Sequence, residues 1–216
     1  MTYRDFTLEK LEDDFGIINR NERFLENSLP VPPSDFLLKT LARNLKMPIR
    51  NEKSRSEWIV APILAELKEL NNDFFTVHSG EYLNVDKTQG LMGECNFIIT
   101  KNYNSITLKA PVFALVEAKK ENFDEGISQC AAQMYAARLF NQKRDPAIAI
   151  IHGCVTIGTT WIFLKLEEKD LLIDNYYYTL NDLPQLLGAL QAILDFYKNK
   201  IWVRYSSTSW ISNYSL

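Results

Sequence analysis

Apolar residues recur at three- and four-residue spacings in five segments of the chain, and this pattern predicts five helices. The segments are residues 7–17, 32–47, 54–72, 123–142 and 182–199. The second segment opens with prolines and a Ser-Asp cap, and the last has Asp182 in the capping position. Within the third segment, Pro62 is compatible with a helix only near the first turn or at a kink.

Runs of aromatic and β-branched residues, separated by Gly, Asn and Lys clusters, predict β-strands between these helices. The runs lie within residues 74–85, 93–100, 110–120, 147–155 and 160–179. The run "AIAIIHGCV" is apolar without alternation, which is typical of a strand covered on both faces in the middle of a mixed sheet. The last run contains two strands around a charged turn.

The predicted order of elements is helices, three strands, helix, three strands, helix. This order indicates an α/β fold, a three-layer sandwich with a central mixed β-sheet flanked by helices. No internal repeat or Gly/Ser linker divides the chain, so we expect one main domain over residues 51–200. Residues 1–50 are expected to form an N-terminal helical extension packed on the core, and residues 201–216 a C-terminal tail.

Composition narrows the class of protein. The chain has 216 residues, 46% of them hydrophobic, but no uncharged apolar run of about 18 residues. Its N-terminus is too acidic for a signal or transit peptide, so we expect a soluble, cytoplasmic protein without a membrane partner. The three cysteines have no C-x-x-C spacing and are interpreted as reduced structural thiols. A net charge of -3 argues against a protein that coats polyanions generally, and "KMPIRNEKSR" (46–55) is the best local basic patch.

The motif Glu-x-Lys occurs three times, where average composition predicts about one. The copy at 66–68 lies in a predicted helix, and the copy at 167–169 lies in a predicted turn. Only Glu117-Ala118-Lys119 follows an apolar strand, whose period of two places both charged side chains on one face. One interpretation is a strand end with a surface salt bridge, which is worth about 0 to 1 kcal/mol. The other is a site that uses both charges.

Glu94 begins the preceding strand and is expected to share a face with Glu117 if the two strands form a hairpin. Two carboxylates repel by about 4 kcal/mol at 4 Å in an effective dielectric of 20, so the pair favours a cation between them. Oxygen ligands of this kind suit Mg²⁺ or Mn²⁺. A pairing of Glu94 with Glu117 requires Phe97 opposite Ala114 and a loose connection from about residue 101 to 110.

Three further side chains are candidates for the same site. Stepping 100° per residue along the helix at 54–72 puts Glu57 at the edge of the apolar arc, leaning toward the sheet, and Glu66 outside it. A favourable acid in the first helical turn explains Glu57 equally well. Gln129 and Gln133 share a face of the next helix, where they either reach a phosphate or metal-bound water or form a polar flank.

The order of a helix with Glu57, a strand start at Glu94, a strand end with Glu117 and Lys119, and a helix with Gln129 resembles the PD-(D/E)XK nuclease superfamily. The layout is particularly similar to the N-terminal nuclease domain of type I restriction enzyme R subunits, and the resemblance covers roughly residues 54 to 180. It implies a restriction-endonuclease-like fold and hydrolysis of DNA phosphodiester bonds with Mg²⁺ or Mn²⁺, in restriction or DNA repair.

The resemblance also implies roles for individual residues. Glu94 and Glu117 would hold the metal ion, and Lys119 would orient the attacking water or stabilise the charged phosphorane. Glu57 would assist a metal or water, and Gln129, with Gln133 as a further candidate, would complete the site.

The chain departs from the family pattern at Glu94, where aspartate is usual, and at Gly93, where proline is often found. A Gln-x-x-x-Tyr pattern is absent. The alternative function is therefore a non-catalytic relative that binds nucleic acid or a protein partner, and a homodimer stays open in either case.

Overall fold

Eight strands form one central sheet in the computed structural model, which describes residues 1–101, 105, 107–146 and 148–209, with side chains as far as Ile201. The strands are β1 (Ile18–Asn21), β2 (Phe75–Tyr82), β3 (Glu94–Lys101), β4 (Val112–Ala118), β5 (Ile151–Thr156), β6 (Thr160–Glu167), β7 (Asp170–Ile173) and β8 (Tyr178–Thr179). The sheet order is β1-β7-β6-β5-β4-β3-β2, with β8 paired to β6. The β4–β5 and β1–β7 pairs are parallel and the others antiparallel, so the predicted mixed sheet is confirmed.

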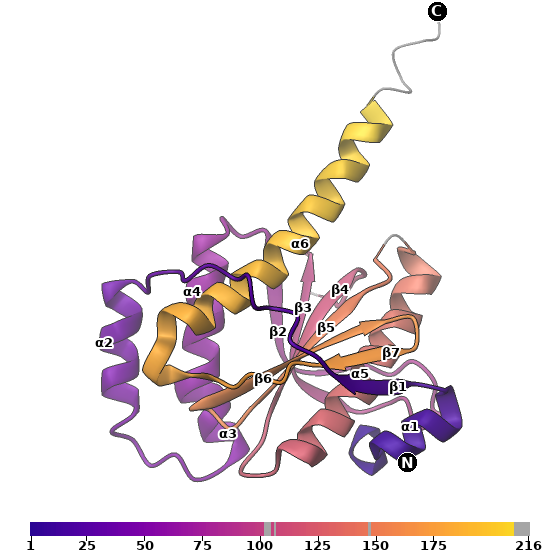
Figure 1. Ribbon diagram of the computed structural model, residues 1–216, viewed down its shortest axis with the longest axis horizontal. Coiled ribbons are helices and arrows are strands. Elements are labelled where there is room, and N and C mark those ends of the chain that lie inside the picture. The colour runs from indigo at the N-terminus through magenta and orange to yellow at the C-terminus, as the bar shows by residue number, and fades with distance from the viewer. Residues whose placement is uncertain (102–104, 106, 147, 210–216) are drawn as a thin grey trace, which may run out of the picture.

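Helices cover both faces of this sheet (Figure 1). They are α1 (Leu8–Phe15), α2 (Asp35–Asn44), α3 (Glu52–Arg55), α4 (Ala61–Leu70), α5 (Phe123–Arg144) and α6 (Leu183–Ser209), with a π-helix over Ser56–Val60 and short 3₁₀ turns at Tyr3–Asp5 and Leu180–Asp182. α5 and α1 lie on one face, and α4, α6 and α2 lie on the other. This arrangement confirms the predicted α/β three-layer sandwich.

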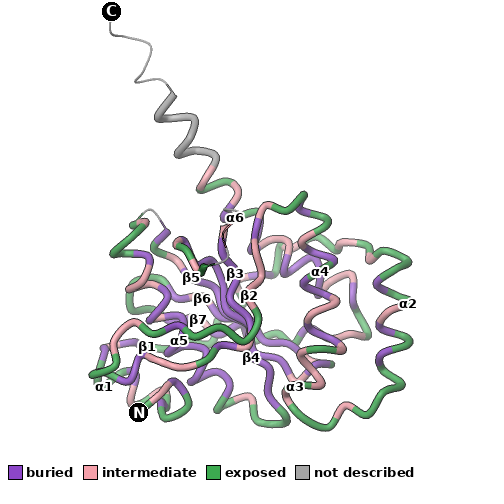
Figure 2. The backbone as a smooth tube through the Cα atoms, turned by 180° about the vertical axis from the view of Figure 1, so that it is seen from behind, coloured by how far each residue is buried: buried purple, intermediate pink, exposed green. Residues whose placement is uncertain are grey.

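The core follows the central strands, which are buried along almost their whole length (Figure 2). Every residue of β4 and of β5 is buried, as expected for strands covered by helices on both faces. The predicted central position of the "AIAIIHGCV" segment is confirmed, since β5 lies between β4 and β6. Its first predicted position, residue 147, lies outside the described residues. No helix in the described part of the chain is long and apolar enough to cross a membrane.

The hairpin of β3 and β4 has a different register from the predicted one. Phe97 lies opposite Val116 rather than Ala114, a shift of two residues. Farther along, Ile99 pairs with Ala114 and Thr100 with Val112, so the register slips by one at a β-bulge in β4. The predicted loose connection is consistent with the strand ends at Lys101 and Val112, although residues 102–104 and 106 lie outside the described residues.

The apolar spacing predicted only helices in residues 1–50, but the structure also contains a strand there. Ile18–Asn21 forms β1, an edge strand that pairs in parallel with β7. All four side chains of β1 are exposed, so the strand lacks the apolar alternation by which a half-buried strand is recognised. Backbone pairing with β7 holds the strand in the sheet, and an exposed ion pair joins Arg20 Nη2 to Asp170 Oδ1 at 3.5 Å.

A π-helix precedes Pro62, where the sequence allowed either a first turn or a kink. Pro62 is the second residue of α4, and the Ala61 amide donates to the Ser56 carbonyl five residues earlier. Proline has no N–H to donate to the Trp58 carbonyl, and Asn44 Nδ2 of α2 donates to that oxygen instead at 2.9 Å. A side chain from a neighbouring helix thus stabilises the irregular segment.

The wider π turn changes which helix faces point inward. Glu57 is exposed, with 52% of its side chain accessible, and its nearest cation is Lys53 at 3.8 Å. The predicted lean of Glu57 toward the sheet is wrong, because the 100° step holds for an α-helix and not for the π segment. Glu66, placed outside the apolar arc, is 6% exposed and accepts hydrogen bonds from the Ser34 backbone amide and hydroxyl.

Candidate functional site

The two charged side chains at the end of β4 are buried. Glu117 is 1% exposed and Lys119 is 6% exposed, and Lys119 Nζ lies 3.4 Å from Glu117 Oε1. The Lys119 amide extends the strand pairing by donating to the Thr156 carbonyl at 2.8 Å. The interpretation as an ordinary surface salt bridge is therefore excluded, since a surface pair keeps both groups in water.

Two glutamines of α5, one helical turn apart, bind the Glu117 carboxylate. Gln129 Nε2 donates to Oε1 at 2.7 Å, and Gln133 Nε2 donates to Oε2 at 3.0 Å. Gln129 Oε1 in turn accepts from Lys119 Nζ at 2.6 Å. Both glutamines are buried, so the interpretation as a polar flank is excluded and the sequence correctly grouped them with the two charges.

Glycine allows α5 to approach the sheet this closely. A Cβ at Gly126 would lie 2.9 Å from Lys119 Cγ, closer than carbon atoms tolerate. The helix begins just before this point, where the Asn122 side chain accepts from the amides of Asp124 and Glu125. The start of α5 is thus fixed directly above the end of β4.

Burial raises the pKa of Glu117 above its usual value of 4.5. The charge of Lys119 and the hydrogen bonds from Gln133 and Lys119 lower this pKa, and the carboxylate of Glu52 raises it again. Desolvation is the largest effect, so the carboxyl group holds its proton more strongly than a carboxyl in water. Gln133 Oε1 is buried without a hydrogen-bond partner among the described residues.

Glu52 is the helix acid that lies nearest to this cluster, with Oε1 at 4.0 Å from Lys119 Nζ. The sequence pattern did not indicate Glu52, because the predicted helix starts at residue 54. In the structure α3 begins at Glu52, and Asn51 caps it by accepting from the Ser54 amide at 2.8 Å. An Asn followed three residues later by Ser was the available signal for this earlier start.

Asn96 lies at the position where the sequence predicted Glu94. Continued by one pair, the observed register places Asn96 opposite Glu117, and Asn96 Oδ1 accepts from the Ala118 amide at 2.9 Å. The same register places Glu94 level with Lys119, about 7 Å farther along the strand than predicted. Glu94 is exposed, and its Oε1 would lie 3.4 Å from a Cβ at Gly80 of β2.

The available ligands for a divalent cation are oxygen atoms. Glu117 and Glu52 supply carboxylates, and the unpartnered Gln133 Oε1 supplies an amide oxygen. Within the described residues no group of three or more His, Cys, Asp or Glu side chains could hold a metal ion. Mg²⁺ commonly binds through one or two carboxylates and keeps several waters, so two acids with amide oxygens match its usual ligands.

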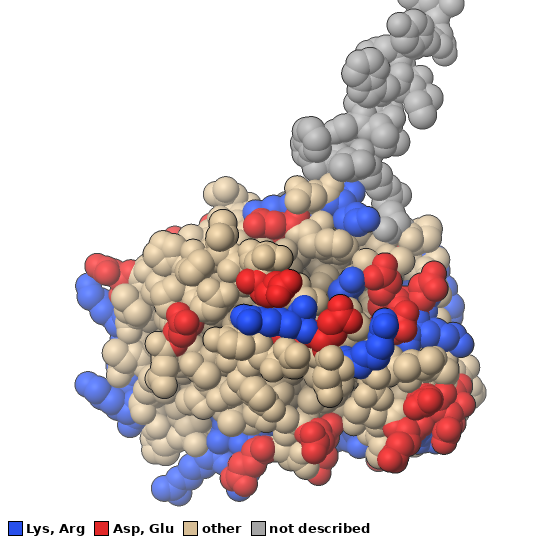
Figure 3. Space-filling model, in the orientation of Figure 1, with Lys and Arg blue, Asp and Glu red and all other residues tan. Residues whose placement is uncertain are grey.

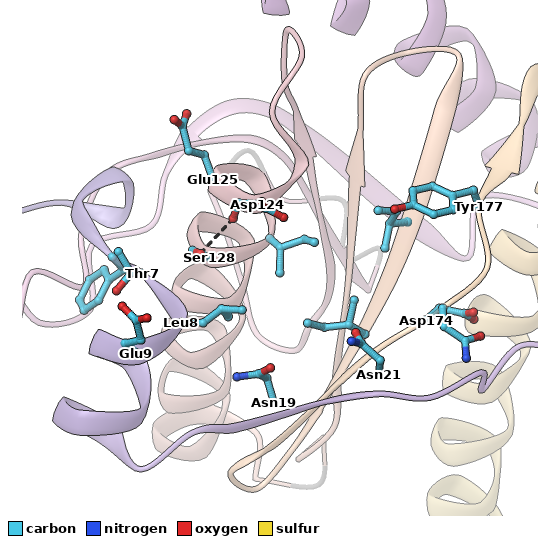
Figure 4. Close-up of a pocket in the computed structure, with 15 residues that line it drawn as sticks. Thr7, Leu8, Glu9, Asn19, Asn21, Asp124, Glu125, Ser128, Asp174 and Tyr177 are labelled. Atoms are coloured by element: carbon cyan, nitrogen blue, oxygen red, sulfur yellow. Dashed lines mark hydrogen bonds between the residues drawn. The ribbon is translucent and has the colours of Figure 1, made fainter.

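A pocket of about 670 Å³ lies away from the Glu117–Lys119 cluster. It is bounded by α1, β1, the start of α5 and the segment after β7 (Figure 4). Its lining includes four acids and no basic residue: Glu9, Asp124, Glu125 and Asp174. None of the predicted site residues lines it.

Charges of both signs are interleaved on the face shown in Figure 3. That face therefore carries no uniform basic field of the kind that attracts nucleic acid generally.

The three cysteines are buried and free, as predicted, and burial raises the pKa of each thiol.

The site therefore consists of Glu117, Lys119, Gln129 and Gln133, which are joined by hydrogen bonds, with Glu52 as a second acid at its edge.

Comparison of the sequence with protein-family models and with curated proteins found no match.

Proposed function

We propose that the protein hydrolyses phosphodiester bonds in DNA with Mg²⁺ or Mn²⁺ at the Glu117–Lys119 cluster. The observation that carries this proposal is the burial of Glu117 and Lys119 in a network with Gln129 and Gln133. A buried charge pair is often no better for stability than apolar residues of similar volume. Ionisable groups that are buried and perturbed in this way cluster at functional sites, which supports a chemical role.

Each side chain has a distinct task in the proposed reaction. Glu117 would hold the metal ion, which would activate water and neutralise charge on the phosphate oxygens. Lys119 has three N–H donors, of which Gln129 takes one at 2.6 Å and Glu117 attracts another at 3.4 Å. The remaining donor would stabilise the charge that develops on the phosphate. Gln129 and Gln133 position the carboxylate.

Two residues compete for the second carboxylate of the proposed metal site. Glu94 was predicted from the sequence, whereas Glu52 lies closer to Lys119 in the structure. We place Glu52 in this role, because its carboxylate also raises the pKa of Glu117 and therefore acts directly on that group. Glu52→Gln should then reduce cleavage more than Glu94→Gln does.

A second candidate function is a non-catalytic relative that binds nucleic acid or a protein partner. The observation that favours it is Asn96, a neutral amide opposite Glu117. An amide oxygen is a weaker ligand for Mg²⁺ than a carboxylate because it brings no negative charge to the cation. Hydrogen bonds to both oxygens of Glu117 also compete with metal ligation.

Cleavage of plasmid and linear DNA with Mg²⁺, Mn²⁺ or EDTA tests the two functions. Metal-dependent cleavage that Glu117→Gln abolishes would support the nuclease, with Lys39→Gln, an exposed change on α2, as the control. If the wild type does not cleave DNA but Asn96→Asp does, the non-catalytic alternative is established. The missing carboxylate at residue 96 would then be the cause of the inactivity. No cleavage by either protein would contradict the nuclease proposal.

A further inference from the structure

Two neighbouring polar side chains beside the cluster have buried atoms without a hydrogen-bond partner among the described residues. These atoms are Nη1 of Arg55 and Oγ of Ser56. Both residues are only half-buried as a whole, so each keeps an accessible side. A buried polar atom left unpaired is destabilising, and more so when it is charged, so such atoms call for an explanation.

Arg55 is held next to the end of β4 by contacts that the structure defines. Its Nε donates to the Ile157 carbonyl at 2.9 Å, and the preceding residue, Thr156, accepts the hydrogen bond from the Lys119 amide. Glu52, three residues before Arg55 and therefore on the same helix face, lies 4.0 Å from Lys119 Nζ. The guanidinium and the lysine thus belong to the same end of the sheet.

The local backbone keeps this arrangement in place. Gly158 has a φ of +89°, which favours glycine, and a Cβ there would lie 3.0 Å from Ile59 and 3.4 Å from Arg55 Cγ. The turn after β5 can therefore lie directly against Arg55. Ser56 is the first residue of the π-helix, and π segments of this kind are frequent at functional sites.

The chemistry of the two orphan groups points to an anion. Arg55 is always a cation and donates only, and the Ser56 hydroxyl can donate as well. A planar guanidinium matches the oxygens of a phosphate group better than those of a neutral ligand, and the Ser56 hydroxyl is a second donor on the next residue. Lys119 Nζ lies at the same end of the sheet, with one N–H beyond those directed at Gln129 and Glu117.

We propose that Arg55 and Ser56 form a phosphate-binding subsite beside Glu117 and Lys119, which holds one phosphate of a bound nucleic acid. The assignment of that phosphate to nucleic acid rests on the proposed function, whereas binding of the phosphate group itself does not. Within a nuclease the subsite would fix the register of the strand relative to the reacting phosphate. Within a non-catalytic relative it would supply affinity alone.

The direct test follows the Arg55 Nε–H resonance in proton–nitrogen NMR spectra during titration with inorganic phosphate, in EDTA. A saturable shift of this resonance, weakened severalfold in Ser56→Ala, is the expected result. An unchanged Arg55 resonance would overturn the proposal, because the guanidinium would then be satisfied within the protein.

The second test measures binding of a short DNA duplex by fluorescence anisotropy in EDTA. Arg55→Gln should weaken binding by at least about tenfold, as expected for a hydrogen-bonded charge, whereas Lys39→Gln should change it by less than about twofold. An equal loss in both variants would mean that overall charge alone matters and would refute the subsite. Circular dichroism checks folding, and Ser56→Ala, which removes only the hydroxyl, decides the matter if Arg55→Gln does not fold.

The outcomes separate this subsite from the proposed function. Phosphate binding at Arg55 without cleavage in any metal would keep the subsite and reject the nuclease. Cleavage that depends on Glu117 without a response of Arg55 to phosphate would keep the nuclease and reject the subsite.

Discussion

At the scale of single residues, burial determines what Glu117 and Lys119 can do. On the protein surface the pair would contribute little to stability. At 1% and 6% exposure, each charge has lost most of its water and depends on its hydrogen-bond and ion-pair partners for stabilisation. Gln129 contacts both residues and therefore couples them, since its amide donates to the acid and its oxygen accepts from the lysine. A change at either charge is expected to reach the other through this glutamine.

Lys119→Met should reduce turnover in protein that remains folded, because methionine fills about the same volume without the charge. A positioned charge that acts on the transition state is worth a few kcal/mol, so the rate of DNA cleavage should fall about 10²-fold or more. Initial rates and a urea unfolding curve, recorded on the same preparation, check this. Cleavage at the wild-type rate would show that the lysine is not catalytic.

The pH dependence of stability should reveal the buried state of Glu117. Its pKa is raised in the folded protein, so the contribution of this group is fully present below the unfolded value of about 4.5 and is lost as pH rises through the folded value. Between pH 4 and pH 8 the wild type should therefore lose stability relative to Glu117→Gln, as measured by urea unfolding at each pH.

A divalent cation should reverse part of that loss, because it binds the ionised carboxylate. At pH 8, Mn²⁺ should raise the unfolding midpoint of the wild type and not that of Glu117→Gln. Equal responses of the two proteins to Mn²⁺ would mean that the ion binds at a site without Glu117 or does not bind.

At the scale of elements, the segment from α3 to α4 shows how one proline shapes a site. Pro62 removes the donor for the Trp58 carbonyl, Asn44 of α2 replaces it, and the π turn between them sets which side chains face inward. Glu57 consequently lies in solvent while Glu52 lies beside Lys119. Helix geometry, rather than residue type, distinguishes the two acids.

Asn44→Ala should destabilise the protein by about 1 to 3 kcal/mol, since it leaves the Trp58 carbonyl without its side-chain donor. In the double variant Asn44→Ala/Pro62→Ala, the new amide at residue 62 can donate to that carbonyl. The double variant should therefore be less destabilised than the sum of the two single variants, as measured by a double-mutant cycle of unfolding free energies. Additive effects would argue against this role of Asn44.

At the scale of the whole molecule, the first 50 residues are part of the core rather than an attachment to it. β1 pairs with β7, and the core includes apolar side chains from the segments on either side of β1. Those that are nearly inaccessible are Tyr3, Leu11, Ile17 and Leu37. An independent domain over residues 51–200 would expose this surface to water.

A fragment of residues 51–200 should therefore fail to fold. A fragment of residues 1–200 should fold, since it keeps every strand in the described part of the chain and the buried residues of α6 up to Tyr197. Circular dichroism and thermal unfolding of the two fragments test this. A cooperative transition in the shorter fragment would support the predicted boundary at residue 50.

The local pattern of the sequence determined much of the fold and the centre of the site. Period two in β4 put Glu117 and Lys119 on one face, and period 3.6 in α5 put Gln129 and Gln133 on another, because these periods are properties of the backbone. The same periods predicted the order of helices and strands and the central position of β5. These features need no knowledge of distant contacts.

Only the tertiary structure decided which residues of other elements lie next to the cluster of Glu117, Lys119, Gln129 and Gln133. The register of β3 against β4 depends on a long connection and a bulge, so the sequence could not choose between Glu94 and Asn96 as the neighbour of Glu117. The choice of Glu52 over Glu57 depends on Asn44, which satisfies a carbonyl that Pro62 leaves free. β1 is a strand because β7 offers it hydrogen bonds, and its exposed side chains lack the apolar alternation that would have predicted a strand.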